Sequence, residues 1–242
     1  MNGKDKFTLV RKPSSAVEKA ALGAKRILSG MITDTLALAK RQISAEAQGE
    51  ELVAIFERAN ELLYGEDPLE GIRLYKMVAE KGDADAQYVL GYCYESGEGV
   101  EQDYAEAEKW YRKAAEQNHA GAQCGLGYLA QDYAQAVRWY RKAAEQNHAE
   151  AQYALADCYY RGDGVPQNMV EAVQWYLKAA EQGNADAQYR LGMCYWDGRG
   201  VVKDEAEAKK WQDKAREKWR KIEEERLLIR EKVEREQSGA DF

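Results

Sequence analysis

One motif in this chain recurs four times at nearly constant spacing. Each copy is an Ala-Gln pair with a leucine four residues after the alanine. The copies begin 36, 29 and 36 residues apart, at Ala86, Ala122, Ala151 and Ala187, and four tryptophans recur 29, 36 and 36 residues apart, at Trp110, Trp139, Trp175 and Trp211. Repeats of this length form solenoids, in which each unit buries its apolar face against its neighbours. The spacing therefore predicts a stack of short units rather than one large core.

The unit at residues 86–121 has the pattern of a helical hairpin. Residues 86–95 carry apolar and small side chains at helical spacing, and the glycines within residues 97–100 supply a turn before a second helix that starts at Asp103. Gly91 lies inside the first helix, where a glycine costs about 1 kcal/mol relative to alanine. Because this glycine returns in two other units, we expect the helices to approach closely there.

Both ends of the second helix carry recognisable cap residues. An acidic or amide residue followed three positions later by Glu or Gln satisfies free N–H groups at a helix start. This pattern occurs five times, at Asp67/Glu70, Asp103/Glu106, Asp132/Gln135, Asn168/Glu171 and Asp204/Glu207. The expected helix ends are Gly82, Asn118, Asn147 and Gly183, and glycine and asparagine are the residues suited to a left-handed cap. The two signals together fix the register of the hairpins.

The second helix of most units also contains Trp-Tyr-x-Lys-Ala-Ala, as at Trp110-Tyr111. We expect each tryptophan to be buried between hairpins. With the Ala-Gln-x-x-Leu and Gly-x-Gly-Val motifs, this pattern resembles the Sel1-like repeat family over about residues 67–215. The resemblance implies an all-α fold, a right-handed superhelical solenoid of stacked helix-turn-helix repeats similar to tetratricopeptide repeats, with the first helix of each unit lining the concave side.

The array departs from regularity in three places. Residues 49–85 read as a degenerate first hairpin without the Ala-Gln signature, and residues 86–203 hold the Sel1-like repeats. The third unit is seven residues short and lacks the Gly-x-Gly-Val loop. The stop expected at position 219 is Trp219, so the last helix should continue from about Asp204 to Arg235.

The predicted last helix spans residues 204–236 and leaves 237–242 as a tail. It is interpreted as a long C-terminal capping helix with a solvated far end, or alternatively as a helix that contacts a partner or makes a dimer. Its apolar stripe is too short and interrupted for a sustained coiled coil.

The first 48 residues differ in charge from the rest. Residues 1–41 carry nine Lys or Arg against three Asp or Glu, a net charge of +6. Because the whole chain has a net charge of −7, residues 42–242 have a net charge of −13. Three interpretations stay open for residues 1–48: a short helix over residues 16–28 packed on the first hairpin, a flexible tail, or a basic amphipathic segment that meets a membrane or an acidic partner.

Composition narrows the class of protein. Binding to duplex DNA needs clustered Lys and Arg, so this acidic chain is not expected to bind nucleic acid. No apolar run approaches the roughly 20 residues of a membrane span, and no secretory signal is evident, so a membrane role is disfavoured. Equivalent repeat positions lie about 10 Å apart, too far for a disulfide. We therefore expect a cytoplasmic protein whose four cysteines, Cys93, Cys124, Cys158 and Cys194, are reduced and buried.

No motif points to catalysis, a cofactor or a metal. The Gly-x-Gly loops follow helices and lack the third glycine of a dinucleotide-binding turn. His119 and His148 are expected to be exposed loop residues without further ligands spaced for a metal. No nucleophile lies beside a candidate base, so we expect no enzyme; a hydrolase using surface carboxylates is the less favoured alternative.

A partner surface is predicted on the first helices. Positions spaced by 4, 3 and 4 residues share one helix face, and this face carries acidic and aromatic residues that vary between units. The predicted strip comprises Asp85, Val89, Tyr92, Ser96, Tyr128, Glu150, Asp157, Arg161, Asp186, Arg190, Met193 and Asp197. We expect it to hold a peptide or protein segment of some basic character, which makes the chain a noncatalytic interaction scaffold or adaptor. A solvated surface without a ligand, and a membrane-surface adaptor that works through residues 1–41, are the competing interpretations.

Overall fold

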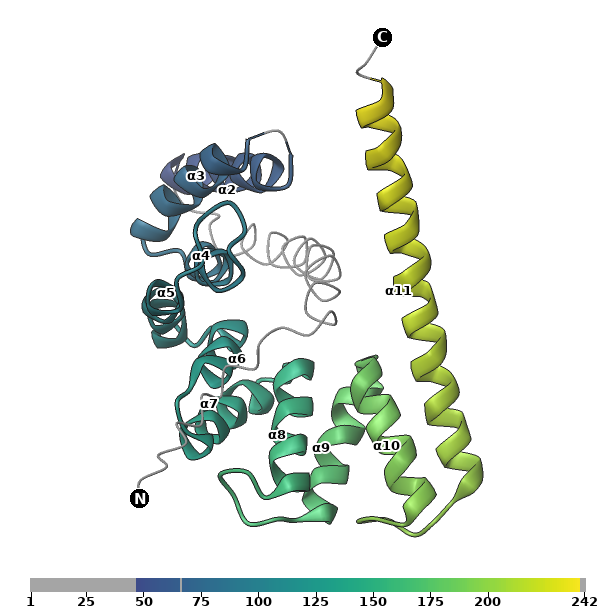
Figure 1. The fold of residues 1–242 in the computed structure, drawn as a ribbon. Coiled ribbons are helices and arrows are strands. Elements are labelled where there is room, and N and C mark those ends of the chain that lie inside the picture. The colour runs from purple at the N-terminus through teal and green to yellow at the C-terminus, as the bar shows by residue number, and fades with distance from the viewer. Residues whose placement is uncertain (1–46, 66, 240–242) are drawn as a thin grey trace, which may run out of the picture. The chain divides into compact units, whose positions relative to one another are not determined.

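The computed structural model describes residues 47–65 and 67–239, which form ten helices and contain no strand (Figure 1). They are α2 (Ala47–Leu63), α3 (Pro68–Glu80), α4 (Ala84–Ser96), α5 (Tyr104–Glu116), α6 (Ala120–Leu129), α7 (Tyr133–Glu145), α8 (Ala149–Arg161), α9 (Met169–Glu181), α10 (Ala185–Asp197) and α11 (Glu205–Gly239). The predicted all-α array of helical hairpins is confirmed.

The described helices group into two compact units, α2 to α7 and α8 to α11. In the first unit the hairpins α2/α3, α4/α5 and α6/α7 are linked by packing of α3 on α4 and of α5 on α6. In the second unit the hairpins α8/α9 and α10/α11 are linked by packing of α9 on α10. Within each unit, therefore, the second helix of one hairpin packs on the first helix of the next.

The predicted caps start and end the second helices. Asp103 accepts the N–H groups of Ala105 and Glu106, and the other four predicted start residues accept the N–H group three positions later. At the ends, Asn118 and Asn147 are the non-glycine residues with positive φ among the described residues, at 65° and 66°. Gly82 and Gly183 take the same left-handed conformation, at 100° and 85°. The sequence register of the hairpins is confirmed.

A tyrosine, rather than the residue before it, fills the centre of four of the five hairpins, and Gln212 holds this position in the last. Tyr111 and Tyr176 are 1% and 0% exposed, whereas Trp110 and Trp211 lie near the core edge and the other two repeat tryptophans are half-buried. The expectation that every tryptophan is buried between hairpins was therefore wrong for two of the four. Their indoles lie towards the surface, where the lysine three residues later covers the ring.

The glycines inside the first helices make room for these tyrosines. A Cβ on Gly91 would lie 2.4 Å from the ring of Tyr111, and one on Gly125 would lie 2.6 Å from the same ring. Tyr111 of α5 is thus held between α4 and α6. The predicted close approach at this glycine position is confirmed, and its cause is an aromatic ring that needs the space.

The glutamine of each Ala-Gln pair is buried, and in three of the four units it links the two helices of its hairpin. Gln87 accepts a hydrogen bond at 2.9 Å from Gln117, at the end of α5. The same contact recurs at 2.7 Å from Gln146 to Gln123 and from Gln182 to Gln152. Buried polar groups need such partners, which explains why a polar residue is retained inside each hairpin.

The last hairpin ends differently, as predicted. α11 continues through Trp219 to Gly239, and its buried residues within the described side chains are Ala208, Trp211 and Ala215. Lys218 holds the position of the donor glutamine, and among the described residues Gln188 Oε1 has no hydrogen-bond partner. The interpretations offered for residues 1–48 lie almost wholly outside the described residues.

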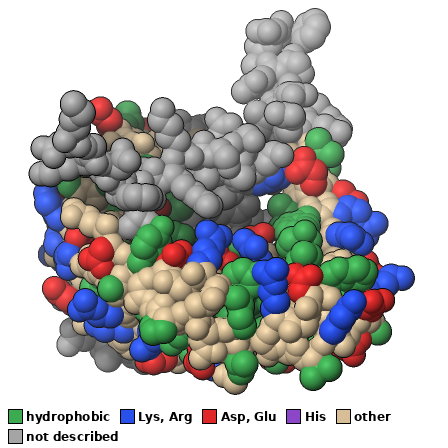
Figure 2. Space-filling view, turned by 60° about the horizontal axis from the view of Figure 1, so that its bottom comes forward, with side chains coloured by type: hydrophobic (Ala, Val, Ile, Leu, Met, Phe, Trp, Pro, Cys, Tyr) green, Lys and Arg blue, Asp and Glu red, His purple; other side chains and the backbone are tan. Residues whose placement is uncertain are grey.

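Three further features concern the cysteines, the apolar character of the helices and the surface charge. All four cysteines are buried, and none of them forms a disulfide. None of the helices that the structure describes combines the length and apolar character needed to cross a bilayer. On the face shown in Figure 2, Lys and Arg side chains are interspersed with Asp and Glu, and neither sign of charge dominates.

Candidate interaction surface

In the first unit, the starts of α4 and α6 are joined by a histidine. His119 Nδ1 accepts the N–H of Ala122 at 3.1 Å, and its Nε2 lies 3.0 Å from Asp85 Oδ1. Because Nδ1 accepts, Nε2 carries the proton and donates to Asp85. The ring also stacks on Tyr88, with centroids 4.7 Å apart. The expectation that His119 is an exposed loop residue was wrong, since its side chain is only 19% exposed and caps α6.

The same position is used twice more. His148 caps α8 by accepting the N–H of Ala151, so its expected role as an exposed loop residue was also wrong. In the second unit Asn184 caps α10 and donates to Glu150 Oε2 at 3.0 Å. Asn184 and Glu150 correspond to His119 and Asp85. A cap residue that bonds to an acid on the preceding first helix therefore holds neighbouring first helices in register within each unit.

Four predicted residues form the surface that we call the unit 1 strip. Asp85 and Tyr92 are half-buried, and Ser96 and Tyr128 are exposed. Val89 does not belong to it, because its side chain is 1% exposed and packs in the core. Sequence spacing alone could not show that Val89 packs with Tyr75 and Leu90 in this cluster.

Seven predicted residues form the unit 2 strip: Glu150, Asp157, Arg161, Asp186, Arg190, Met193 and Asp197. Asp157 is its centre, with Tyr176 donating to Oδ1 at 2.6 Å and Arg161 Nη2 lying 2.7 Å from Oδ2. Arg190 of α10 lies 3.6 Å from the same carboxylate. The structure thus brings α8 and α10 together through the predicted residues, as the sequence pattern required.

The charge of the unit 2 strip is uneven. It carries four carboxylates against two guanidinium groups, and both guanidinium groups are engaged by Asp157. Glu150, Asp186 and Asp197 remain exposed, while Met193 is half-buried. A strip of this composition offers excess negative charge around a fixed ion-pair cluster.

Sequence reasoning missed a half-buried acid beside the unit 1 strip, Glu95. Glu95 Oε2 accepts from Tyr111 at 2.6 Å. Burial raises the pKa of the Glu95 carboxyl, and the hydrogen bond from Tyr111 opposes that shift only in part. The missed signal was the tyrosine that follows three of the four repeat tryptophans, because a buried tyrosine hydroxyl needs an acceptor on the facing helix. Among the described residues no group of three or more His, Cys, Asp or Glu could hold a metal ion.

Known proteins share this arrangement. A Sel1 repeat protein of Oxalobacter formigenes superposes with a TM-score of 0.66 and 33% identity, covering 72% of this chain and 76% of that one. A protective antigen present in uropathogenic Escherichia coli strains, which displays an SLR fold, gives 0.63 and 30%, covering 82% of this chain and 48% of that one.

A curated relative matches over a shorter stretch. The DAP3-binding cell death enhancer 1 of Rattus norvegicus is 35% identical over 57 residues, which are 24% of this chain and only 11% of that protein. The Sel1 repeat model matches five consecutive segments, residues 53–83, 84–119, 120–148, 149–184 and 185–218. These matches cover well over half of the sequence and coincide with the five hairpins of the structure, and so the chain belongs to the Sel1 repeat family.

Proposed function

We propose that this protein is a noncatalytic scaffold that binds a peptide or protein segment of basic character along its first-helix strips. Sel1 repeat proteins are generally scaffolds for protein interactions. One relative is named for binding another protein, although its match here is confined to a short stretch. Fold alone does not give a function, so the proposal rests on the strips.

The observation that carries the proposal is the rigid polar cluster at Asp157. Three different helices, α8, α9 and α10, hold this carboxylate through Arg161, Tyr176 and Arg190. Fixed side chains lose little conformational freedom when a ligand binds. The exposed carboxylates on either side then favour a ligand with Lys or Arg residues, because electrostatic complementarity selects the partner and its orientation.

Site-specific photocrosslinking tests the location. A photoreactive amino acid at Tyr128 or Met193 samples the two strips, and the same group at Glu116 or Gln174 samples exposed positions on second helices as matched controls. We expect one partner segment, identified by mass spectrometry, to crosslink at the strip positions and not at the controls. Equal crosslinking at strip and control positions would reject the strips as the binding surface.

A further inference from the structure

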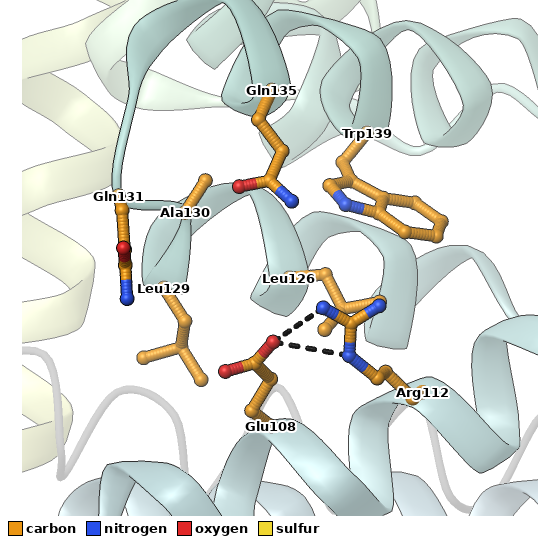
Figure 3. Close-up of a pocket in the computed structure, with 8 residues that line it drawn as sticks. All are labelled: Glu108, Arg112, Leu126, Leu129, Ala130, Gln131, Gln135 and Trp139. Atoms are coloured by element: carbon orange, nitrogen blue, oxygen red, sulfur yellow. Dashed lines mark hydrogen bonds and ion pairs between the residues drawn. The ribbon is translucent and has the colours of Figure 1, made fainter.

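A hollow lies at the third hairpin, beside the second helix of the hairpin before it. Its volume is about 240 Å³, and it lies between α5, α6 and α7 (Figure 3). Glu108 and Arg112 reach into it from α5, and Gln135 and Trp139 reach into it from α7. Leu129, close to the end of α6, closes one side.

The hollow lies at the hairpin whose loop is missing. In the α4–α5 loop, a Cβ on Gly99 would lie 3.1 Å from Ile72, and Val100 packs against the same core cluster. In the α10–α11 loop, Gly200 lies against the backbone of Met169 and Val170. Each of these loops covers the start of the second helix in the preceding hairpin. The α6–α7 connection has no such loop to cover the start of α5.

The alignment of the units identifies what is absent. Gln131 corresponds to Glu95 and Asp132 corresponds to Asp103, so the missing seven residues correspond to residues 96–102. The position under the missing loop has changed as well. Glu108 stands where α3 and α9 carry Ile72 and Val173, which are 8% and 6% exposed.

The lining therefore does not resemble an apolar core. The Glu108 side chain is 41% exposed, and its Oε1 accepts from Arg112 Nε at 3.0 Å. Gln131 and Gln135 add two carboxamides, which can both donate and accept, and Trp139 adds an indole N–H. Main-chain peptide groups need both a donor and an acceptor, and this lining offers both, with the half-buried Leu129 beside them.

We propose that the hollow receives a loop of a partner protein, a glycine-containing turn with one small aliphatic side chain that takes the place of the missing segment. The chain's own loops show that this shape fits against the start of a second helix. The hollow shares no residue with the unit 1 strip or the unit 2 strip. The proposal therefore adds a second contact site to the scaffold and can fail without affecting the first.

The missing segment itself is the probe. A synthetic peptide of residues 96–102, Ser-Gly-Glu-Gly-Val-Glu-Gln, is titrated into the full ¹⁵N-labelled chain and followed by NMR. We expect saturable shifts at Leu129, Gln131 and the Trp139 indole N–H. Both glycines of the native loop have φ above +70°, which alanine disfavours, so the peptide with both glycines changed to alanine should bind at least tenfold more weakly.

Two variants of the protein complete the test. Insertion of the same seven residues between Gln131 and Asp132 restores the full unit and should abolish the peptide shifts while keeping or raising the melting temperature. Gln131→Trp should also block the site by filling it, whereas Gln174→Trp, an exposed control on α9, should not.

Each outcome of these experiments either supports or overturns the proposed loop site. Absence of saturable shifts in the unmodified protein, or their persistence in the insertion variant, overturns the proposal. Concentration-dependent dimerisation that the insertion abolishes would mean that a second copy fills the hollow, and this also overturns the assignment to a distinct partner. Replacement of Asp157 and Arg190 in the unit 2 strip should leave the peptide response unchanged.

Discussion

At the scale of single residues, the buried tyrosine hydroxyls differ in what they bond. The hydroxyls of Tyr111 and Tyr176 donate to Glu95 and Asp157. Tyr75 occupies the same position in the first hairpin, yet its hydroxyl is buried without a partner among the described residues. Burial raises the pKa of Tyr75 and Tyr176, so both remain protonated at neutral pH.

This difference predicts opposite effects of removing the hydroxyl. Tyr176→Phe should lower the free energy of unfolding by about 1.5–3 kcal/mol, because it breaks a hydrogen bond to a charged group. Tyr75→Phe should change it by less than about 0.5 kcal/mol or raise it, since no bond is lost. Urea denaturation measures both. Equal losses in the two variants would show that Tyr75 has an acceptor after all.

The cysteines give a prediction with a defined pH window. Burial raises the pKa of the Cys158 thiol to about 12 and that of Cys194 to about 11. A pKa raised by folding stabilises the folded state below the unfolded value of about 8.5, and this stability is lost as pH rises towards the folded pKa. The unfolding midpoint in urea should therefore fall between pH 8.5 and pH 11, and less steeply in the double variant Cys158→Ala/Cys194→Ala. The control is thiol labelling at pH 8, which should require denaturant.

At the scale of elements, the buried glutamines tie the first helix to the second helix in three hairpins but not in the last. Gln152 accepts from Gln182 and donates to Asn147 at 3.1 Å. Gln188 keeps only its donation to the carbonyl of Ala180, because α11 does not end where the donor glutamine would stand. We call this set of glutamine–glutamine hydrogen bonds the glutamine ladder. It is present in the hairpins α4/α5, α6/α7 and α8/α9, and its bond is missing from α10/α11.

Gln152 and Gln188 should therefore contribute differently to the free energy of unfolding. Gln152→Leu should cost about 1–2 kcal/mol of unfolding free energy through the hydrogen bonds it removes, and Gln188→Leu about 1 kcal/mol less, because this change also removes an unsatisfied acceptor. Equilibrium denaturation of both variants, with the exposed Gln174→Leu as a control, provides the comparison. A larger loss of unfolding free energy for Gln188→Leu than for Gln152→Leu would contradict this role of the glutamine ladder.

The sequence was sufficient to predict where the helices begin and end, but not which side chains pack between them. Cap residues act locally, so Asp103 and Asn118 fixed helix ends from the sequence alone. Trp110 and Tyr111 look equivalent in a pattern, and only packing shows that the tyrosine enters the glycine slot. The burial of Val89 and the capping role of His119 likewise depend on a neighbouring helix that periodicity does not place.

At the scale of the whole molecule, four of the five hairpins carry the polar strips on their first helices, α4, α6, α8 and α10. The described structure gives the scaffold two kinds of surface: acidic strips, and a hollow where one loop is missing. Stacked units contact only their neighbours, so surface changes on one first helix should alter binding without unfolding the array. This separation of binding from stability is what a scaffold function requires.

Affinity for the crosslinked partner segment, made as a synthetic peptide and measured by calorimetry, tests the central claim most directly. The variant Asp186→Lys/Asp197→Lys reverses two exposed charges of the unit 2 strip, and Glu181→Lys/Asp213→Lys makes the same change in net charge on second helices. We expect the strip variant to bind at least tenfold more weakly, about 1.4 kcal/mol, with its melting temperature unchanged, and the control to bind within twofold of the unmodified protein. Equal affinity in all three proteins would contradict binding along the first-helix strips.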